Sequence, residues 1–211
     1  YYQHICYGYC VSDGSLFALK SELSYLWTVN IGMALENIRK WQWINRMNEK
    51  INRMWKYDML TQVLNRSGFF YCAETILQKI KEEKSNAFII FLDIDGLKSV
   101  NDNLGHEIGD AFIAKIAGIL KEVVPKDCLI MRYGGDEFVV FGSCKQAGRM
   151  QRIAEDIKAA IKTADQKENR SYHLAASLGC SLHKSYEMDN LNSLIELADK
   201  KMYEEKKNKR R

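Results

Sequence analysis

The sequence has few of the residues that break or cross-link a chain. Pro125 is its only proline and marks the end of one predicted helix. Charged residues interrupt every hydrophobic stretch, so there is no run of about 18 apolar residues and no membrane-spanning helix is expected. No C-x-x-C pair occurs, and Cys6 and Cys10 lack partners at the spacing of a zinc finger. We therefore expect the 6 cysteines to be reduced, mostly buried thiols of a cytoplasmic protein.

Positive charge is in excess only at one end of the sequence. The 31 Lys+Arg and 27 Asp+Glu give a formal net charge of +4. Residues 200–211 alone hold seven basic and two acidic side chains, which leaves residues 1–199 close to neutral. A nucleic-acid-binding protein spreads its basic residues over a face or a stripe, so we expect no nucleic-acid partner. With 46% hydrophobic and 27% charged residues, the composition is that of a globular protein.

Three parts are expected along the chain. It begins at Tyr1 with neither an initiator Met nor a signal-peptide pattern, so we interpret it as a piece of a longer protein whose upstream anchor or sensor is absent. Residues 1–14 look like the last strand of that upstream domain. Residues 15–57 are expected to form a long signalling helix, and residues 58–211 a domain in which strands and helices alternate.

The helical part carries a heptad pattern. Late in the segment, apolar residues recur at alternating steps of three and four residues, at Ile44, Met47, Ile51 and Met54. Extended backwards, the same register places asparagine at two a positions, Asn30 and Asn37, where this residue fixes the pairing register and favours a two-stranded coiled coil. The pattern favours a homodimeric coiled coil, with a single amphipathic helix lying on its own domain as the alternative.

From Tyr57 onward the pattern predicts an α+β fold. Residues 87–94 are a continuous apolar run of strand length, which is typical of a strand buried on both faces. Strand patterns also cover residues 129–133, 138–141 and 172–180, and helical periodicity covers residues 68–84, 107–124, 145–164 and the segment from about 190. Gly134-Gly135 indicates a hairpin. This order predicts a mixed sheet with flanking helices on one face, close to the split βαβ folds.

Two pairs of acidic residues lie at strand ends. Asp93 and Asp95 end the buried strand, and Asp136 and Glu137 follow the two glycines of the hairpin. An ionised carboxylate at the end of a buried strand needs a partner or a metal ion. If the hairpin pairs beside the first strand, both clusters meet at one end of the sheet, where oxygen ligands suit Mg²⁺ or Mn²⁺ and a polyphosphate substrate. The two glycines are expected to turn the backbone with positive φ.

These residues resemble the motifs of a known family. The run Arg132-Tyr133-Gly134-Gly135-Asp136-Glu137-Phe138 is the name-giving motif of the GGDEF domain, the diguanylate cyclase family. Four further motifs of the family follow its order over residues 58–210: Asp58-x-Leu60-Thr61-x-x-x-Asn65-Arg66, Asp93-Ile94-Asp95-x-x-Lys98-x-x-Asn101-Asp102, Gly105-His106-x-x-Gly109-Asp110, and Ala198-Asp199-x-x-Met202-Tyr203-x-x-Lys206-x-x-x-Arg210. The resemblance implies a fold similar to the palm of polymerases and nucleotidyl cyclases.

The resemblance also implies a reaction, in which two GTP molecules are joined into cyclic di-GMP with release of two pyrophosphates. It implies that Asp93, Asp136, Glu137 and the backbone carbonyl of Ile94 hold metal ions, with Asp136 and Glu137 as the catalytic residues. Two Mg²⁺ or Mn²⁺ ions per site activate a 3′-hydroxyl, stabilise the leaving pyrophosphate and align the attack. Asp136 also matches the position proposed in the family as general base.

Substrate recognition is implied residue by residue. Asn101 and Asp110 match the guanine-reading positions, with His106 nearby. A buried carboxylate at Asp110 accepts hydrogen bonds from guanine N1–H and the exocyclic amine, whereas adenine leaves it unsatisfied, which favours GTP over ATP. The phosphate contacts of the family correspond to Lys98, Lys206 and Arg210.

The sequence departs from the family pattern at two points that matter here. The family's product-inhibition motif, R-x-x-D, corresponds to Pro125 and Cys128, so we expect no inhibition by cyclic di-GMP through that site. Lys209 replaces a glycine near the end of the chain. Neither change touches an implied metal or guanine position, so cyclase activity is expected to be retained.

A dimer is implied because each site holds one GTP and the product needs two. The register of the helical segment would then decide whether the two sites meet. Residues 16–39 are similar to the last helix of a GAF-type sensor domain, and residues 6–12 to the strand before it. The alternative function is a catalytically silent GGDEF domain that binds GTP or a protein, as a receptor or a dimerisation module.

Overall fold

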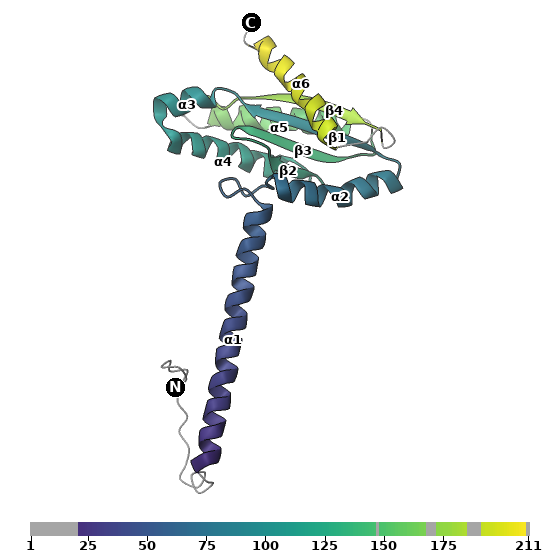
Figure 1. The fold of residues 1–211 in the computed structure, drawn as a ribbon. Helices are drawn as coiled ribbons and strands as arrows, with labels where there is room; N and C mark the ends of the chain where they lie inside the picture. The colour runs from purple at the N-terminus through teal and green to yellow at the C-terminus, as the bar shows by residue number, and fades with distance from the viewer. Residues whose placement is uncertain (1–20, 147, 168–171, 185–190, 210–211) are drawn as a thin grey trace. The chain divides into compact units, whose positions relative to one another are not determined.

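The computed structural model describes residues 21–146, 148–167, 172–184 and 191–209 (Figure 1). The upstream remnant expected over residues 1–14, with its GAF-like strand, lies outside these ranges, as does Arg210. Along the part of the chain that is described, no helix combines the length and the apolar character needed to cross a membrane.

Helices and strands alternate along the chain as the sequence predicted, after one long helix. In chain order the elements are α1 (Ser21–Lys56), α2 (Arg66–Glu82), β1 (Asn86–Ile94), α3 (Leu97–Leu104), α4 (His106–Val123), β2 (Leu129–Arg132), β3 (Glu137–Cys144), α5 (Arg149–Lys167), β4 (Ala176–His183) and α6 (Leu191–Lys209).

The chain divides into two units, Tyr1–Arg53 and Met54–Arg211. The described part of the first unit is α1, a helix of 36 residues that continues to Lys56. The heptad residues of α1 are exposed within the single chain: Ile44 is 49% and Ile51 is 58% exposed. An exposed apolar stripe on a helix of this length is the surface that a coiled-coil partner covers.

The second unit is built on one sheet with the strand order β2-β3-β1-β4. Every pair in this order runs antiparallel. The predicted α+β class is therefore confirmed, but the sheet is antiparallel and not mixed: within the described residues, parallel pairing occurs only at an isolated bridge between Leu64 and Met131. β1 is central, and all its residues from 87 to 94 are buried, as its unbroken apolar sequence predicted.

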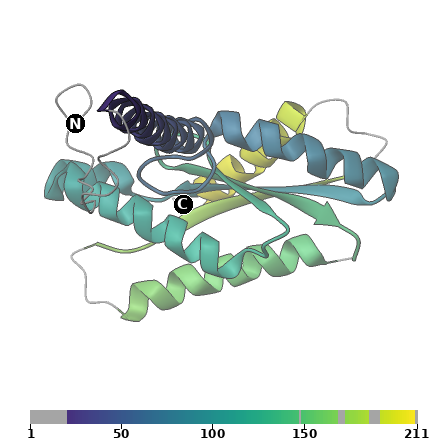
Figure 2. The ribbon, with the colours of Figure 1, turned by 90° about the horizontal axis from the view of Figure 1, so that it is seen from below.

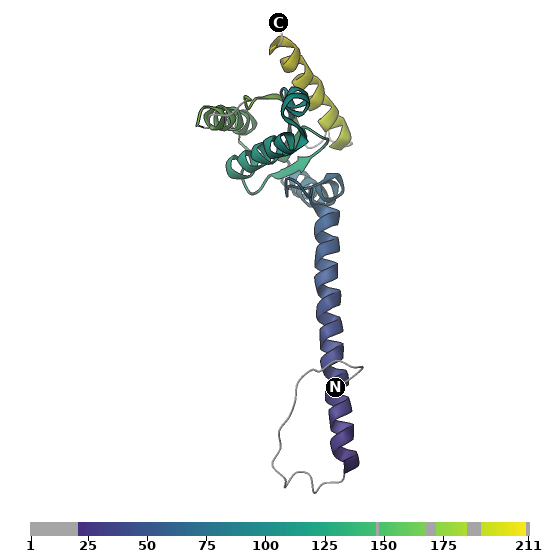
Figure 3. The same ribbon diagram turned by 90° about the vertical axis from the view of Figure 1, so that its left-hand side faces the viewer.

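Helices cover both faces of the sheet, so the expectation of helices on one face is wrong. Figures 2 and 3 show α2 and α6 on one side and α4 and α5 on the other. Side chains alternate between the faces of a strand. Phe88 and Ile90 of β1 therefore belong to the core under α4 and α5, while Ile89 and Phe91 belong to the core under α2 and α6.

β4 and α5 both begin later in the chain than the sequence predicted, and β3 extends to Cys144, beyond the predicted 138–141. β4 begins at Ala176 and not at residue 172, since the N–H of Leu174 donates to Oδ1 of Asp165 at 2.7 Å and Tyr172 packs on Phe112 with ring centroids 5.1 Å apart. α5 begins after Gly148, whose φ of 81° no helix can contain. The short helix α3 was not predicted.

The cysteines that the structure describes are all free thiols. Cys128 and Cys144 are buried, and Cys72 and Cys180 are half-buried. Burial raises the pKa of Cys128 to about 11. A thiol with so high a pKa is a poor nucleophile at neutral pH, in agreement with a packing role.

Candidate active site

The ends of three strands meet at one edge of the sheet. β1 ends there, and β3 and β4 begin there because both run antiparallel to β1. Asp93 lies opposite Glu137 on one side and Ser177 on the other. The N–H of Ile94 donates to the carbonyl of Asp136 at 3.0 Å. The structure therefore brings together the two acidic clusters that the sequence singled out.

The carboxylates at this edge are buried or half-buried, and they repel one another. Asp93 is only 8% exposed. Burial raises the pKa of Asp93, and Asp136 and Asp95 raise it further, although the ammonium of Lys206, bonded to Oδ1, acts in the opposite direction. Burial also raises the pKa of Glu137, again helped by Asp136. Concentrated negative charge of this kind is stabilised by a cation.

The hairpin turn between β2 and β3 is closed by the Tyr133 N–H, which donates to the carbonyl of Glu137 at 2.8 Å. The guanidinium of Arg132 donates to the carbonyl of Gly135 at 2.8 and 3.2 Å. The positive φ expected at the two glycines is wrong, since neither Gly134 nor Gly135 has one. Gly134 instead provides space: a Cβ there would lie 2.4 Å from Oε2 of Glu137. The glycine lets this carboxylate lie against the turn.

Asp58 connects the start of the domain to the hairpin. Arg132 Nη1 lies 3.1 and 3.2 Å from the two carboxylate oxygens of Asp58, and Thr61 donates its N–H and its hydroxyl to Oδ1 at 2.9 and 2.6 Å. Burial acts to raise the pKa of Asp58, but the Thr61 bonds and the Arg132 charge outweigh it and lower the pKa. Both motifs were expected from the sequence, but the bond that joins them across 74 residues was not.

Asn65 joins α2 to the end of α1. Its side-chain oxygen accepts from the N–H of Gly68 at 2.9 Å and caps α2. Its amide nitrogen donates to the carbonyls of Met54, Trp55 and Tyr57, at 3.2, 2.9 and 3.3 Å. Carbonyls in the last turn of a helix have no partner within it, so one side chain satisfies groups of two helix ends.

The last turn of α6 brings two lysines to the acidic edge, the end of the sheet that carries Asp93, Asp95, Asp136 and Glu137. Lys206 bonds Oδ1 of Asp93. Lys209 Nζ donates to three acceptors at the ends of β1 and β4: Asp95 Oδ2 at 3.2 Å, the carbonyl of Ala176 at 2.7 Å and Ser177 Oγ at 3.1 Å. Lys206 was expected at this site from the sequence and Lys209 was not, although a spacing of three residues places both on one helix face.

The residues implied in nucleotide binding lie on α3 and α4. Lys98 and Asn101 are on α3, and His106 and Asp110 are on α4. Gly105, with a φ of 88°, ends the first helix and begins the second. This conformation favours glycine, which lets α4 start immediately after α3.

Asn101 is half-buried, whereas Lys98, His106 and Asp110 are exposed. The burial expected for Asp110 is therefore wrong, because α4 turns its apolar face, with Phe112, to the core and leaves Asp110 outside. An exposed carboxylate can still accept hydrogen bonds from water. Discrimination against adenine therefore requires that the bound base cover Asp110 and exclude water from it.

Gly109 lies directly against Asn101. A Cβ on Gly109 would be 1.8 Å from Oδ1 and 2.9 Å from Cγ of that side chain. The missing side chain of Gly109 thus leaves the space that the Asn101 amide occupies.

The acidic edge fits a divalent cation by the chemistry of its donors. Asp93, Asp136, Glu137 and the carbonyl of Ile94 all offer oxygen, which Mg²⁺ and Mn²⁺ prefer. Over the described ranges, no group of three or more His, Cys, Asp or Glu side chains is arranged to hold a metal ion by itself. Mg²⁺ is usually held by one or two carboxylates together with substrate phosphates, so these donors fit an ion that binds with a triphosphate.

The surroundings of Cys128 differ from an R-x-x-D motif. The guanidinium of Arg149 lies 3.7 Å from its sulfur. The same guanidinium donates to both carboxylate oxygens of Asp127 at 2.7 Å and to the carbonyl of Ser143 at 2.8 Å. Arg149 is therefore engaged by acceptors of its own chain.

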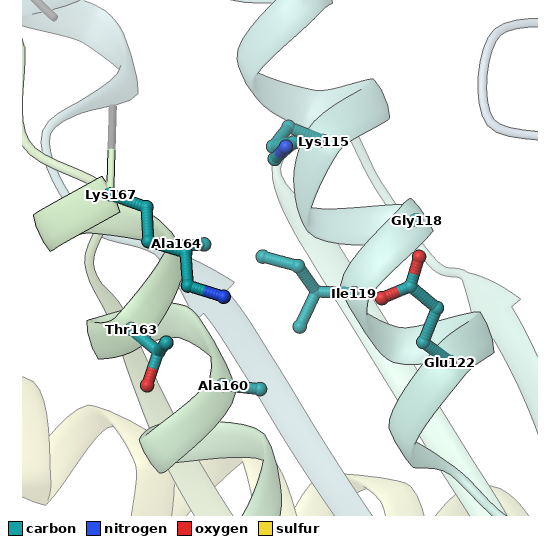
Figure 4. Close-up of a pocket in the computed structure, with 8 residues that line it drawn as sticks. All are labelled: Lys115, Gly118, Ile119, Glu122, Ala160, Thr163, Ala164 and Lys167. Carbon is teal, nitrogen blue, oxygen red and sulfur yellow. The ribbon is translucent and has the colours of Figure 1, made fainter. Parts of the chain in front are cut away.

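A groove of about 360 Å³ lies between α4 and α5 (Figure 4). Gly118, Ile119, Ala160 and Ala164 contribute to its walls. None of the residues implied in metal, phosphate or guanine binding lines it, so the groove is separate from the acidic edge.

The fold and this edge define an α+β domain whose clustered carboxylates and facing lysines suit a nucleoside triphosphate. The family model described as "Diguanylate cyclase, GGDEF domain" matches residues 55–211. The chain belongs to this family.

Curated relatives are similar over most of the chain. Diguanylate cyclase A of Treponema denticola is 29% identical over 199 residues, 92% of this chain and 53% of the relative. Diguanylate cyclase VdcA of Vibrio cholerae is 32% identical over 168 residues, 77% of this chain and 48% of the relative. An uncharacterized membrane protein of Staphylococcus epidermidis is 31% identical over 69% of this chain and 39% of its own length. The chain spans about half the length of these relatives, or less.

Solved structures share the fold. The coiled coil and GGDEF domain of DgcB from Caulobacter crescentus, in complex with c-di-GMP, has a TM-score of 0.74 and 23% identity, and the match covers 86% of this chain and 95% of that chain. A sensory box/GGDEF family protein from the same species has a TM-score of 0.64 and 26% identity, with 72% and 99% covered.

Proposed function

We propose that this chain is an active diguanylate cyclase, which joins two GTP molecules into cyclic di-GMP and releases two pyrophosphates. The observation that carries the proposal is the meeting of Asp93 with Asp136 and Glu137 at one sheet edge, with Lys206 bonded to Asp93. Membership of the family, and relatives named as diguanylate cyclases, support the same reaction.

The acidic edge would hold two Mg²⁺ or Mn²⁺ ions through Asp93, Asp136, Glu137 and the carbonyl of Ile94. When bound, the ions would neutralise the triphosphate and the leaving pyrophosphate. The contribution of the chain itself is a set of oxygen donors held in place by the strand pairing of β1 and β3. Their mutual repulsion favours cation binding over an empty edge.

In each half-reaction, the 3′-hydroxyl oxygen of one GTP forms a bond to the α-phosphorus of the other. The bond from that phosphorus to the β-phosphate breaks, and pyrophosphate leaves with the electron pair. Asp136, in the hairpin turn, is the proposed acceptor of the hydroxyl proton. Repetition with the two nucleotides exchanged closes the ring.

The remaining implied residues would orient each GTP. The proposed phosphate contacts are Lys98, Lys206 and Arg210, since their positive ammonium and guanidinium groups complement the negative charge of the triphosphate. Asn101 and Asp110 would bind the guanine base from α3 and α4, with His106 beside them. Lys206 would exchange its bond with Asp93 for one with the phosphates.

Because one site holds one GTP, we propose a homodimer formed through α1. The exposed heptad residues of α1 support it, and Asn30 and Asn37 would favour two strands. Ile51→Asp should shift the chain from dimer to monomer in sedimentation velocity and lower activity at equal chain concentration. Asn52→Asp, which adds the same charge outside the seam, should change neither; a dimeric Ile51→Asp variant would contradict the seam.

We further infer that an upstream sensor of GAF type controls the domain and that the domain works in the cytoplasm, where GTP is available. The pattern of residues 16–39 supports the sensor. Fusion of the chain to a constitutively dimeric or monomeric partner at its start would show whether upstream pairing changes the rate.

The decisive experiment is incubation of the dimer with GTP and Mg²⁺, followed by chromatography and mass spectrometry. We expect cyclic di-GMP with two pyrophosphates for each product. Asp136→Asn should lower the rate by about a hundredfold or more, whereas Asp156→Asn, an exposed residue of α5, should leave it unchanged. GTP binding without product from the dimer would support a silent receptor instead.

A further inference from the structure

Several contacts hold the final helix against the sheet, and two of them flank Lys206 along the helix. The first is Gly179 of β4, where a Cβ would lie 2.0 Å from the carbonyl of Ala198 and 2.2 Å from the nitrogen of Met202. The backbones of strand and helix therefore touch in the middle of α6. Lys206 lies about one turn, and Lys209 about two turns, beyond Met202 of this anchor.

Lys209 makes the second of these contacts. Its ammonium bonds Asp95, Ala176 and Ser177, and it lies 3.4 Å from Glu205 of its own helix. Ser177 is fully buried and donates its hydroxyl to Asp95 at 2.8 and 3.1 Å. One side chain thus ties the last turn of α6 to the end of β1 and the start of β4.

The position of this tie relates directly to the acidic edge. Ser177 pairs with Asp93 in the sheet, and Ala176 pairs with Ile94. Lys209 therefore bonds the strand residues beside the carboxylate that Lys206 bonds. Helix ends fray because their last carbonyls lack partners within the helix. A bond from the last turn to the sheet limits that fraying where Lys206 lies.

We propose that Lys209 is a positioning residue, which fixes the last turn of α6 on the ends of β1 and β4 so that Lys206 is held at the acidic edge to bind the triphosphate. This inference rests on the proposed cyclase function for the identity of the ligand.

The test compares Lys209→Gln with Lys207→Gln, which removes the same charge from the same turn. Lys207 lies over the ring of Tyr203 on its own helix, 4.5 Å from the ring centroid. The probe is 3′-deoxy-GTP with Mg²⁺, which has no 3′-hydroxyl and cannot react. Its affinity is measured by calorimetry, and amide hydrogen exchange of residues 205–209 is measured without nucleotide.

We expect Lys209→Gln to weaken 3′-deoxy-GTP binding about fivefold or more and to speed exchange in the last turn. Lys207→Gln should change neither, and Lys209→Arg, which keeps the donors, should restore part of the affinity. Equal affinities for the two glutamine variants, or unchanged exchange in Lys209→Gln, overturn the inference. If the unaltered chain does not bind 3′-deoxy-GTP, the cyclase proposal fails, whereas the exchange data still decide whether Lys209 fixes the last turn.

Discussion

The contact between Gly109 and Asn101 allows a sharp test of how the guanine base is read. Replacement of Gly109 by alanine puts a methyl group 1.8 Å from Oδ1 of Asn101. The nearest atoms are the far end of a side chain, so Asn101 can rotate away without displacing the backbone. Gly109→Ala should therefore damage the site and spare the fold.

The size of the effect follows from the distances. Asn101 Oδ1 must move by roughly 1.2 Å or more to reach an acceptable contact, and a hydrogen bond of about 2.9 Å does not survive such a shift. Loss of one bond to the base costs about 1–2 kcal/mol. This corresponds to a rise of roughly 5–30-fold in the KM for GTP.

Stability should change in the opposite direction. Gly109 lies in α4, and alanine is favoured over glycine inside a helix by about 0.5–1 kcal/mol. We expect the Tm of Gly109→Ala to equal or exceed that of the unaltered chain. Gly118→Ala is the matched control, because Gly118 is in the same helix and a Cβ there meets nothing within 4 Å.

The assay is the initial rate of pyrophosphate release against GTP concentration, with Tm from calorimetry. A double-mutant cycle with Asn101→Ala isolates the contact, since Gly109→Ala should have no further effect once the side chain it strikes is gone. The reasoning is refuted if the KM of Gly109→Ala stays within twofold of the unaltered value, or if Gly118→Ala loses as much.

Three further predictions concern charge and feedback. The raised pKa of Glu137 makes the folded state bind a proton more tightly than the unfolded state, so the free energy of unfolding should fall as pH rises above 4.5, the ordinary pKa of a glutamate. Calorimetry without divalent cations should therefore show that the Tm advantage of Glu137→Gln over the unaltered chain grows from pH 4 to 7. Asp58→Asn should lower the urea-derived free energy of unfolding by about 2–3 kcal/mol, whereas Asp127→Asn, in a more exposed ion pair, should lower it by less than about 1 kcal/mol. Because the pKa of Asp58 is lowered in the folded state, the stabilisation that Asp58 provides should be lost as pH falls below about 3.8. With Pro125 and Cys128 in place of the inhibitory charges, added cyclic di-GMP should leave the initial rate unchanged, and half-inhibition at low micromolar product would contradict this.

The central strand could be predicted almost residue by residue. Its unbroken apolar run permits only a position with both faces covered, and the acid residues that end it indicated a site before any pairing was known. The meeting of Asp93 with Glu137 was predicted only on the condition that the hairpin pairs beside this strand, and the antiparallel pairing of β1 and β3 meets that condition. Local pattern alone was sufficient for the strand and its acidic end.

The covering of both faces could not be predicted in this way. An amphipathic helix shows that it has a buried face, but not which side of a sheet that face meets. The choice depends on the order β2-β3-β1-β4, which is set by pairing between strands distant in sequence. The same limit applies to the bond between Asp58 and Arg132, which neither local motif specifies.

Lys209 illustrates what a family pattern conceals. As a substitution for glycine it had no implied role, and its neighbours in sequence are also basic. Only the packing of α6 shows that its ammonium reaches Ser177 and Asp95, while Lys207 two residues earlier lies over Tyr203.

The basic end of the chain matches the acidic edge because strand and helix repeat in step. Odd-numbered residues of β1 face α6: Ile89 and Phe91 meet its apolar turns, and the same alternation continues to Asp93 and Asp95. The buried face of α6 likewise runs through apolar positions, including Ala198 and Met202, before it reaches Lys206 and Lys209. Apolar turns of α6 thus pack on apolar residues of β1, and its basic last turn meets the acidic residues at the end of that strand. Two of the basic side chains at the end of the sequence, Lys206 and Lys209, therefore complement a local negative edge.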